Sequence, residues 1–182
     1  MKPELIIFTD IGDTVIDEGT EVRKVPFGVV YHADCSPGAK ETLLELHRRG
    51  YAIVMVADGL AESFHNTMRE NGLTHVFSAE VISELLNSQK PAPLMFRTAM
   101  ESLGLTDADR RRVIMVGNNI ERDVAGANRF GITSVLLDWS PRYAYAPKND
   151  DEIPNFRIHA PGELLDLVER LNARLQPEEI AE

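Results

Sequence analysis

Short apolar runs alternate with amphipathic stretches along this chain, and that alternation is the feature that most limits its fold. The apolar runs predict strands at residues 5–8, 52–56, 113–116 and 133–137, with a short one starting at Val76-Phe77. Apolar residues at helical spacing predict helices at residues 39–49, 60–71, 93–103, 120–130 and 162–175. Because alternating strands and helices pair in parallel through right-handed crossovers, we expect an α/β protein with helices on both faces of a parallel sheet.

Glycines mark the ends of the predicted helices. A glycine follows each of the first four, at Gly50, Gly72, Gly104 and Gly131, which is the usual residue just past a helix. Pro93 lies in the first turn of the third helix, where a missing N–H does no harm. These boundaries agree with the strand and helix pattern.

Polar side chains follow the predicted strands. Asp10 follows the first, Asp58 the second, and Asn118 and Asn119 the fourth, while Asp123 lies one turn into the next helix. Lys90 precedes the helix after the third strand. Because a parallel sheet presents its ligand site beyond the carboxyl ends of its strands, we expect these residues to converge at one edge.

Charge and cysteine content exclude several classes of protein. The formal net charge of −10 argues against binding to nucleic acid or to an anionic membrane surface. Cys35 is the only cysteine, so no intramolecular disulfide or cysteine-based zinc cluster can form, and we expect a cytoplasmic protein. The apolar run before Asp10 is too short for a signal peptide or a membrane span, and we expect no membrane association.

Three sequence motifs give this chain a resemblance to a known superfamily. Asp10-Ile11-Gly12-Asp13-Thr14 resembles the Asp-x-Asp-Gly-Thr signature of haloacid dehalogenase (HAD)-like hydrolases. The stretch 88–93 with Phe96 resembles their third motif, and the stretch 116–123 with the small residues after it resembles the fourth. The resemblance implies a three-layer Rossmann-like fold and a Mg²⁺-dependent phosphatase that works through an aspartyl-phosphate on a phosphorylated small molecule or macromolecule.

The resemblance also assigns roles to individual residues. It implies that Asp10 is the nucleophile and that Lys90 neutralises the phosphoryl group. The implied metal site consists of Asp10, Gly12, Asn118 and Asp123. The implied substrate contacts are Ala57, Asp58, Lys90 and Asn119. Asp13 is the remaining candidate for the catalytic acid.

Three positions depart from the superfamily pattern. Gly12 stands where the general-acid aspartate is expected, Ala57 replaces a Ser or Thr, and Asn118 replaces an acidic residue. Asp13 is displaced by one residue, so it either substitutes for the acid or only stabilises the turn. Asn118 can ligate Mg²⁺ through its carbonyl oxygen and can cap the following helix, two roles that are compatible, and the favoured role of Asp58 is a helix cap.

The rest of the chain leaves little room for a cap domain. We expect a single domain over residues 1–182, in which residues 15–31 form a flap-like hairpin and residues 138–155 form a loop over the site edge. Trp139, Arg142 and Tyr143 make this loop either a surface for substrate, an oligomer contact or a partner protein, or a loop pinned to the core.

Three functions remain open at this stage. The first is the magnesium-dependent phosphatase. The second, suggested by the three substitutions, is a weak or inactive relative that binds phosphate or a partner. The third is a metal-independent dehalogenase-like hydrolase, which would need a dry, apolar halide pocket.

Overall fold

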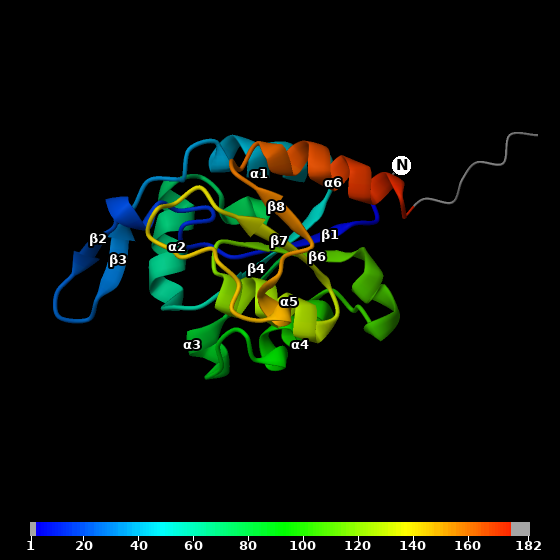
Figure 1. Ribbon diagram of the computed structural model, residues 1–182. Coiled ribbons are helices and arrows are strands. Elements are labelled where there is room, and N and C mark those ends of the chain that lie inside the picture. Colours follow the sequence, from blue (N-terminus) through cyan, green and yellow to red (C-terminus); the bar gives the residue numbers. More distant parts are fainter. Residues whose placement is uncertain (1–2, 176–182) are drawn as a thin grey trace, which may run out of the picture.

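A six-stranded parallel sheet forms the centre of the protein, as the alternating pattern predicts (Figure 1). The computed structural model describes residues 3–175. Its strands follow the order β5-β4-β1-β6-β7-β8 across the sheet. They are β1 (Ile6–Thr9), β4 (Ala52–Ala57), β5 (Ala79–Ile82), β6 (Val113–Gly117), β7 (Thr133–Leu137) and β8 (Phe156–Ile158). The chain runs outward from β1 to one side and then to the other, so the ends of β1 and β6 meet at a topological switch point.

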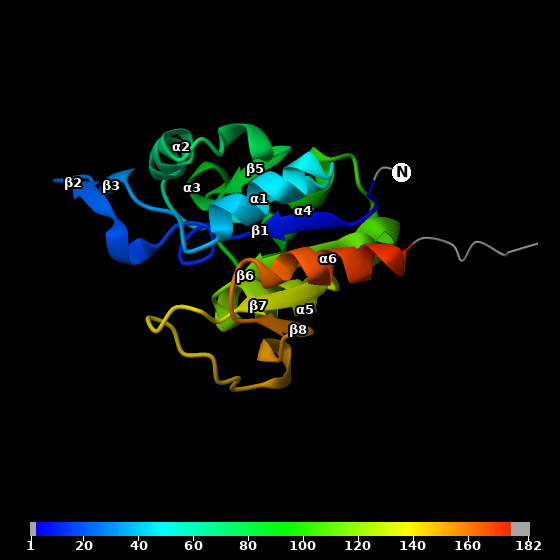
Figure 2. The ribbon, with the colours of Figure 1, turned by 90° about the horizontal axis from the view of Figure 1, so that it is seen from above.

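Two layers of helices cover the two faces of the sheet. The helices are α1 (Ala39–Arg48), α2 (Ala61–Glu70), α3 (Ser83–Leu86), α4 (Pro93–Ser102), α5 (Ala125–Phe130) and α6 (Glu163–Ala173). Because strand side chains alternate, Ile7 packs with α1 and α6, while Phe8 packs with α4 and α5 on the opposite face. Figure 2 shows α1 and α6 side by side over one face. No helix within residues 3–175 is long and apolar enough to cross a membrane.

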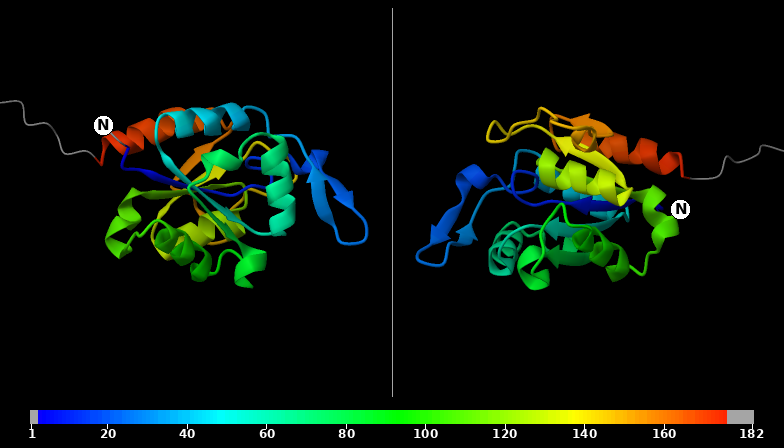
Figure 3. Two further views of the ribbon diagram at one scale, coloured as in Figure 1. Left: turned by 180° about the vertical axis from the view of Figure 1, so that it is seen from behind. Right: turned by 60° about the horizontal axis from the view of Figure 1, so that its bottom comes forward.

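An antiparallel hairpin projects from the carboxyl end of the sheet (Figures 1 and 3). It consists of β2 (Val22–Lys24) and β3 (Val29–His32), and it lies within and just beyond the stretch predicted to form a flap. The Ser63 hydroxyl of α2 accepts a hydrogen bond from the Val30 N–H at 2.9 Å, which ties the hairpin to the body. The hairpin therefore borders the edge of the sheet at which the site residues were expected.

The structure differs from the sequence predictions at three places. The third strand does not begin at Val76, because Thr74–Val76 forms a 3-10 turn that buries Val76 in the core, and β5 begins only at Ala79. The three-residue strand β8 was not predicted, because it is too short to show an alternating pattern. The predicted helix over 120–130 begins as a π-helical turn, Ile120–Val124, before α5.

Candidate active site

Lys90 joins the ends of three central strands. Its Nζ donates to Asp10 Oδ1 at 2.8 Å, to Asp123 Oδ1 at 2.7 Å and to the Val56 carbonyl at 2.7 Å. These partners follow β1 and β6 or end β4, so the predicted convergence at the carboxyl edge is present. Only 2% of Lys90 is exposed, and the three bonds use all three protons of the ammonium group.

The charges around Lys90 keep it protonated. Burial alone would lower the pKa of Lys90, but the carboxylates of Asp10, Asp123 and Asp58 raise it above its usual value. Burial raises the pKa of Asp123, and the nearby Lys90 ammonium opposes that rise. The site thus contains a fixed positive charge between two carboxylates.

Asp10 and Asp123 differ in how their oxygens are used. Asp123 is 1% exposed, and its second oxygen, Oδ2, accepts the Asn119 N–H at 3.0 Å. The Asp10 side chain is 14% exposed, and its Oδ2 has no hydrogen-bond partner among residues 3–175. Asp10 is therefore the carboxylate with an oxygen available to a ligand, and Asp123 holds Lys90 in place.

A cavity of about 240 Å³ opens beside Asp10. The cavity lies between the end of the sheet and the β2–β3 hairpin. Its lining combines carboxylates with cations. The charged residues of this lining are Asp10, Glu18, Glu21, Arg23, Asp58, Lys90, Arg122 and Asp123. Such a lining suits a polar, charged ligand and contrasts with the apolar pocket expected of a dehalogenase.

Asp58 does not cap the following helix, so that prediction was wrong. The residue at the start of α2 is Leu60, and no side chain caps it. Asp58 Oδ1 instead accepts the Lys90 N–H at 3.0 Å, and Oδ2 lies 3.7 Å from Nη1 of Arg122. Burial raises the pKa of Asp58. Ala57 is fully buried at the end of β4 and lies outside the cavity lining, whereas Asp58 lines it.

Asn118 and Asn119 both line the cavity, but their side chains have different surroundings. Asn119 caps the turn that precedes α5, because its Oδ1 accepts the N–H groups of Glu121 and Arg122, each at 3.0 Å. The prediction that Asn118 is the cap was therefore wrong. Asn118 is 1% exposed and lines the cavity, and its Nδ2 has no hydrogen-bond partner in the described chain. An unpartnered N–H donor beside a cavity suits a ligand that accepts a hydrogen bond, such as an anionic oxygen.

The oxygen atoms beside the cavity offer a hard cation such as Mg²⁺ only a few ligands. The described residues contain no cluster of three or more His, Cys, Asp or Glu side chains arranged for a metal ion. Asp10, Asn118 and Gly12 line the cavity, and they contain oxygen donors of the kinds that Mg²⁺ accepts: a carboxylate, an amide and a backbone carbonyl. Both oxygens of Asp123 are occupied, which leaves it a supporting role.

Asp13 is turned away from this cavity and is saturated with hydrogen bonds. It is 0% exposed, and its carboxylate accepts from Arg142 Nε at 2.7 Å, Arg142 Nη2 at 2.6 Å, the Ser140 hydroxyl at 2.7 Å and the Glu18 N–H at 2.9 Å. Burial alone would raise the pKa of Asp13, but these bonds lower it below its usual value. This environment favours the structural alternative for Asp13 over the acid.

The loop after β7 is pinned to the same turn and also reaches the cavity. The Trp139 indole N–H donates to the Asp13 carbonyl at 2.6 Å, and Trp139 packs against the core. Tyr143 lines the cavity, and its hydroxyl donates to Glu18 Oε2 at 2.9 Å. Trp139 therefore fits the interpretation of a loop pinned to the core, while a substrate contact of the loop, at Tyr143, stays a prediction.

Glu18 is the residue that sequence reasoning missed. It begins a 3-10 turn, Glu18–Thr20, and its side chain reaches back to Gly12. Burial raises the pKa of Glu18, and the neighbouring carboxylates of Asp13, Glu21 and Asp10 add to the rise against the Tyr143 hydrogen bond. No motif marks this residue; the one signal in the sequence is the glycine that makes room for it.

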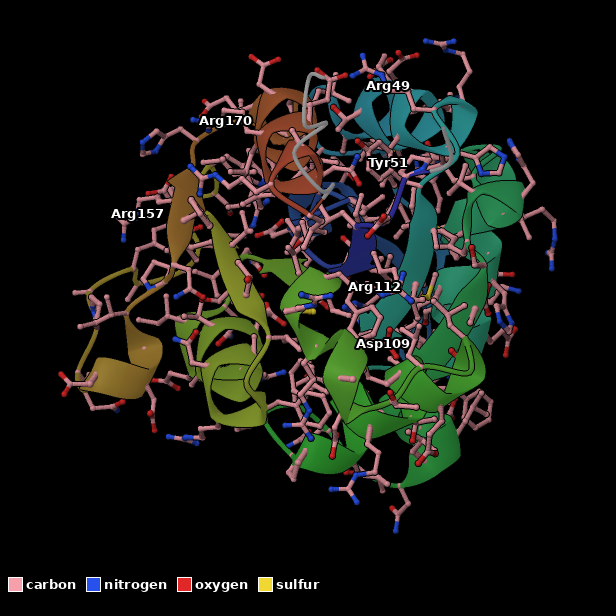
Figure 4. All side chains as sticks on the ribbon, turned by 90° about the vertical axis from the view of Figure 1, so that its right-hand side faces the viewer. Arg49, Tyr51, Asp109, Arg112, Arg157 and Arg170 are labelled. Atoms are coloured by element: carbon pink, nitrogen blue, oxygen red, sulfur yellow. The ribbon has the colours of Figure 1, made fainter. Side chains whose placement is uncertain are left out.

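The opposite end of the sheet contains a different kind of charge cluster (Figure 4). There, Arg112 Nε donates to Asp109 at 2.9 Å, and its Nη1 donates to the Glu4 carbonyl at 3.1 Å. Both side chains of this ion pair are more than a quarter exposed. Such a pair, at the amino ends of the strands, is ordinary surface electrostatics.

The fold and the strand-end lysine between two aspartates define an α/β protein with a charged site at the carboxyl edge of its sheet. A model of the haloacid dehalogenase-like hydrolase family matches residues 21–137. This chain therefore belongs to the haloacid dehalogenase-like hydrolase family. The matched stretch contains Lys90 and Asp123, while Asp10 precedes it.

Several characterised relatives are similar to this chain. A glyceraldehyde 3-phosphate phosphatase from Methanopyrus kandleri is 34% identical over 135 residues, which are 74% of this chain and 57% of the relative. A phosphoserine phosphatase from Thermus thermophilus is 31% identical over 67% of this chain and 46% of its own length. The chain thus spans about half the length of these relatives.

Solved structures share the fold over nearly the whole chain. A HAD phosphatase from Thermococcus onnurineus has a TM-score of 0.72 at 18% identity and covers 92% of this chain and 98% of its own. A dehalogenase with an intermediate complex has a TM-score of 0.74 at 16% identity, with the same coverage. At these identities the likeness concerns the fold alone.

Proposed function

We propose that this protein is a Mg²⁺-dependent phosphatase that forms an aspartyl-phosphate on Asp10. The observation that carries the proposal is the position of the Asp10 carboxylate. One of its oxygens is fixed by the Lys90 ammonium, and the other is unpartnered beside a charged cavity. The names of the related phosphatases support the same reaction class.

The residues present supply the parts that phosphoryl transfer needs. The Asp10 Oδ2 attacks phosphorus, the bond to the leaving oxygen breaks, and the leaving oxygen takes up a proton. Water then attacks the phosphorus of the aspartyl-phosphate, which releases inorganic phosphate and restores the Asp10 carboxylate. Lys90 neutralises charge throughout, and charge is the main obstacle in this chemistry.

The charge balance of the lining favours a divalent cation. Five carboxylates and three cations line the cavity, so a phosphate dianion would enter a field that is negative overall. Asp10, Asn118 and the Gly12 carbonyl would hold Mg²⁺, with Asp123 behind them. When bound, Mg²⁺ supplies a positive charge that offsets repulsion between Asp10 and the substrate.

The charged lining favours the phosphatase over the dehalogenase-like alternative. A halide leaving group needs a dry, apolar pocket, whereas Asp58, Arg122 and Glu21 line this one. The exposed Arg122 at the rim is placed to meet a second anionic group of a phosphorylated substrate.

The test is hydrolysis of p-nitrophenyl phosphate with Mg²⁺ and with a chelator. We expect turnover with Mg²⁺, none in Asp10→Asn, and wild-type turnover in the matched surface variant Asp34→Asn, because Asp34 lies outside the cavity. Intact-mass measurement after acid quenching should find one phosphoryl group on the wild type and none on Asp10→Asn. Turnover that persists in Asp10→Asn would contradict the proposal.

A further inference from the structure

We propose that Glu18 is the catalytic acid of this site and that its carboxyl group replaces the side chain missing at Gly12. This assignment rests on the phosphatase function proposed above. The leaving oxygen of a phosphomonoester needs a proton as its bond to phosphorus breaks, and the residue two positions after Asp10 is a glycine. The geometry around that glycine points to Glu18 as the substitute.

The Glu18 carboxyl occupies the space of the absent side chain. A Cβ added to Gly12 would lie 2.2 Å from Glu18 Oε1 and 3.1 Å from its carboxyl carbon. Non-bonded atoms do not approach to 2.2 Å, so a side chain at position 12 would displace the Glu18 carboxyl from the position that it occupies here. Asp10, Gly12 and Glu18 all line the same cavity, so the substituted group faces the ligand space of the nucleophile.

The other carboxyl groups of the cavity each pair with a cation or an N–H group, but Asp58 Oδ2 is left without a hydrogen-bond partner. Asp123 is bound by Lys90 and by the Asn119 N–H, and Asp58 by the Lys90 N–H. Glu21 is paired with Arg23. Glu18 Oε1 also has no hydrogen-bond partner among the described residues and, unlike Asp58 Oδ2, it lies in the space beside Gly12.

The surroundings of Glu18 direct its free oxygen. The Tyr143 hydroxyl donates to Oε2 at 2.9 Å, so a proton carried by the carboxyl group lies on Oε1, the oxygen beside Gly12. Asp13 holds the backbone of Glu18 through the 2.9 Å hydrogen bond from its N–H. Tyr143 and Asp13 are therefore positioning residues, and the aspartate displaced from the motif anchors the acid instead of being it.

The two half-reactions balance with Glu18 in this role. As Asp10 Oδ2 bonds to phosphorus and the leaving bond breaks, the proton on Glu18 Oε1 passes to the leaving oxygen, which departs as an alcohol. The Glu18 carboxylate then takes a proton from the water that attacks the phosphorus of the aspartyl-phosphate. Both side chains return to their starting forms.

The decisive experiment compares two leaving groups in Glu18→Gln. Release of the leaving group in the first turnover is measured with p-nitrophenyl phosphate and with glycerol 2-phosphate. We expect alcohol release to fall about 10²- to 10⁴-fold, because an alkoxide needs the proton, and nitrophenolate release to fall by less than about tenfold. The phosphoenzyme should then accumulate in the variant, because water loses its base.

A double variant tests the shared space. Gly12 does not have a positive φ, so its backbone accepts an aspartate once the Glu18 side chain is removed. We expect Gly12→Asp in a Glu18→Ala background to restore alcohol release relative to Glu18→Ala alone. Thermal melts of all variants verify folding, and Tyr143→Phe should show a smaller change in the same leaving-group ratio.

Each outcome separates the two proposals. Equal losses for both leaving groups in a folded Glu18→Gln, or no change in either, would overturn the role of Glu18 and leave the phosphatase in place. Failure of Gly12→Asp to restore a folded Glu18→Ala would also overturn it. If the wild type released neither leaving group, the phosphatase function and the role of Glu18 would fall together.

Discussion

Asp10 and Asp13 lie three residues apart on one turn, yet their carboxylates are in opposite situations. Asp10 is held on one oxygen by Lys90 and presents the other to the cavity. Asp13 is completely buried, and four donor groups satisfy it. The first has bonding capacity left for a ligand, and the second has none.

The comparison shows how a carboxylate that can take part in a reaction differs from one that only stabilises the fold. A motif position alone suggests that the second aspartate of the turn performs chemistry. The number of donors around it indicates the reverse, since a carboxylate that accepts four charge-assisted or buried hydrogen bonds is stabilised as the anion. Removing the donors of these two carboxylates, from the Lys90 ammonium to the Ser140 hydroxyl, tests this contrast.

The largest effect is expected for Lys90→Met. Removing the ammonium leaves Asp10 and Asp123 close together without a counter-charge, with Asp123 fully buried. We expect the free energy of unfolding to fall by about 3–5 kcal/mol and the phosphatase activity to be lost. Urea denaturation measures the first and p-nitrophenyl phosphate turnover the second.

The matched control is Lys148→Met, which removes an ammonium from an exposed pair with Glu121. Its effect on stability should stay below about 1 kcal/mol. Equal losses of unfolding free energy in the two variants would mean that the buried Lys90 ammonium stabilises the site no more than an exposed one. The contrast between Asp10 and Asp13 would then lose its basis.

Asp13→Asn should have the next largest effect. The amide keeps the shape but loses the bidentate ion pair with Arg142, whose side chain is 38% exposed and partly screened by water. We expect a loss of about 1–3 kcal/mol in the free energy of unfolding. Asp151→Asn, which breaks the exposed pair with Arg129, is the control and should lose less.

The same variant should make the stability of the protein less sensitive to acid. The pKa of Asp13 is lower in the folded protein than its usual value of 3.8, so its contribution is complete above that value and is lost as the pH falls through the folded pKa. The difference between wild type and Asp13→Asn should therefore be constant near neutrality and shrink below about pH 4. A difference that grows in acid would show that the pKa is raised instead.

Ser140→Ala should have the smallest effect of the three. The buried Ser140 hydroxyl donates only one of the four hydrogen bonds that the Asp13 carboxylate accepts. We expect a loss of about 0.5–1.5 kcal/mol with unchanged chemistry at Asp10. Ser102→Ala, at an exposed hydroxyl on α4, provides the control. A loss larger than that of Asp13→Asn would reverse the order on which the comparison depends.

Local patterns predicted most of the sheet and the helices. Apolar runs gave β1, β4, β6 and β7, and glycines with positive φ end the helices as expected. The strand β8 escaped because three residues carry no detectable period, and Val76 misled because a buried turn residue is as apolar as a strand residue. Boundaries set by tertiary packing are not contained in such short patterns.

The site was likewise predictable only in part from the sequence. The placement of Asp10, Lys90 and Asp123 followed from parallel strands that end at one edge. The contacts of Glu18 with Gly12 and Tyr143 did not, since they depend on a side chain that folds back over a turn and on a loop more than a hundred residues away. The roles of Asp58 and Asn119 were likewise decided by which N–H each carboxyl or amide oxygen reaches.

Trp139 gives the molecule a built-in optical label at the border of the site. It is the only tryptophan of the chain, and its indole N–H is bonded to the carbonyl of Asp13, within the turn that also positions Glu18. All indole fluorescence of the protein therefore comes from Trp139 and depends on its contact with Asp13. A shift in emission that precedes the loss of helical circular dichroism during denaturation reports release of this loop alone, separately from melting of the sheet.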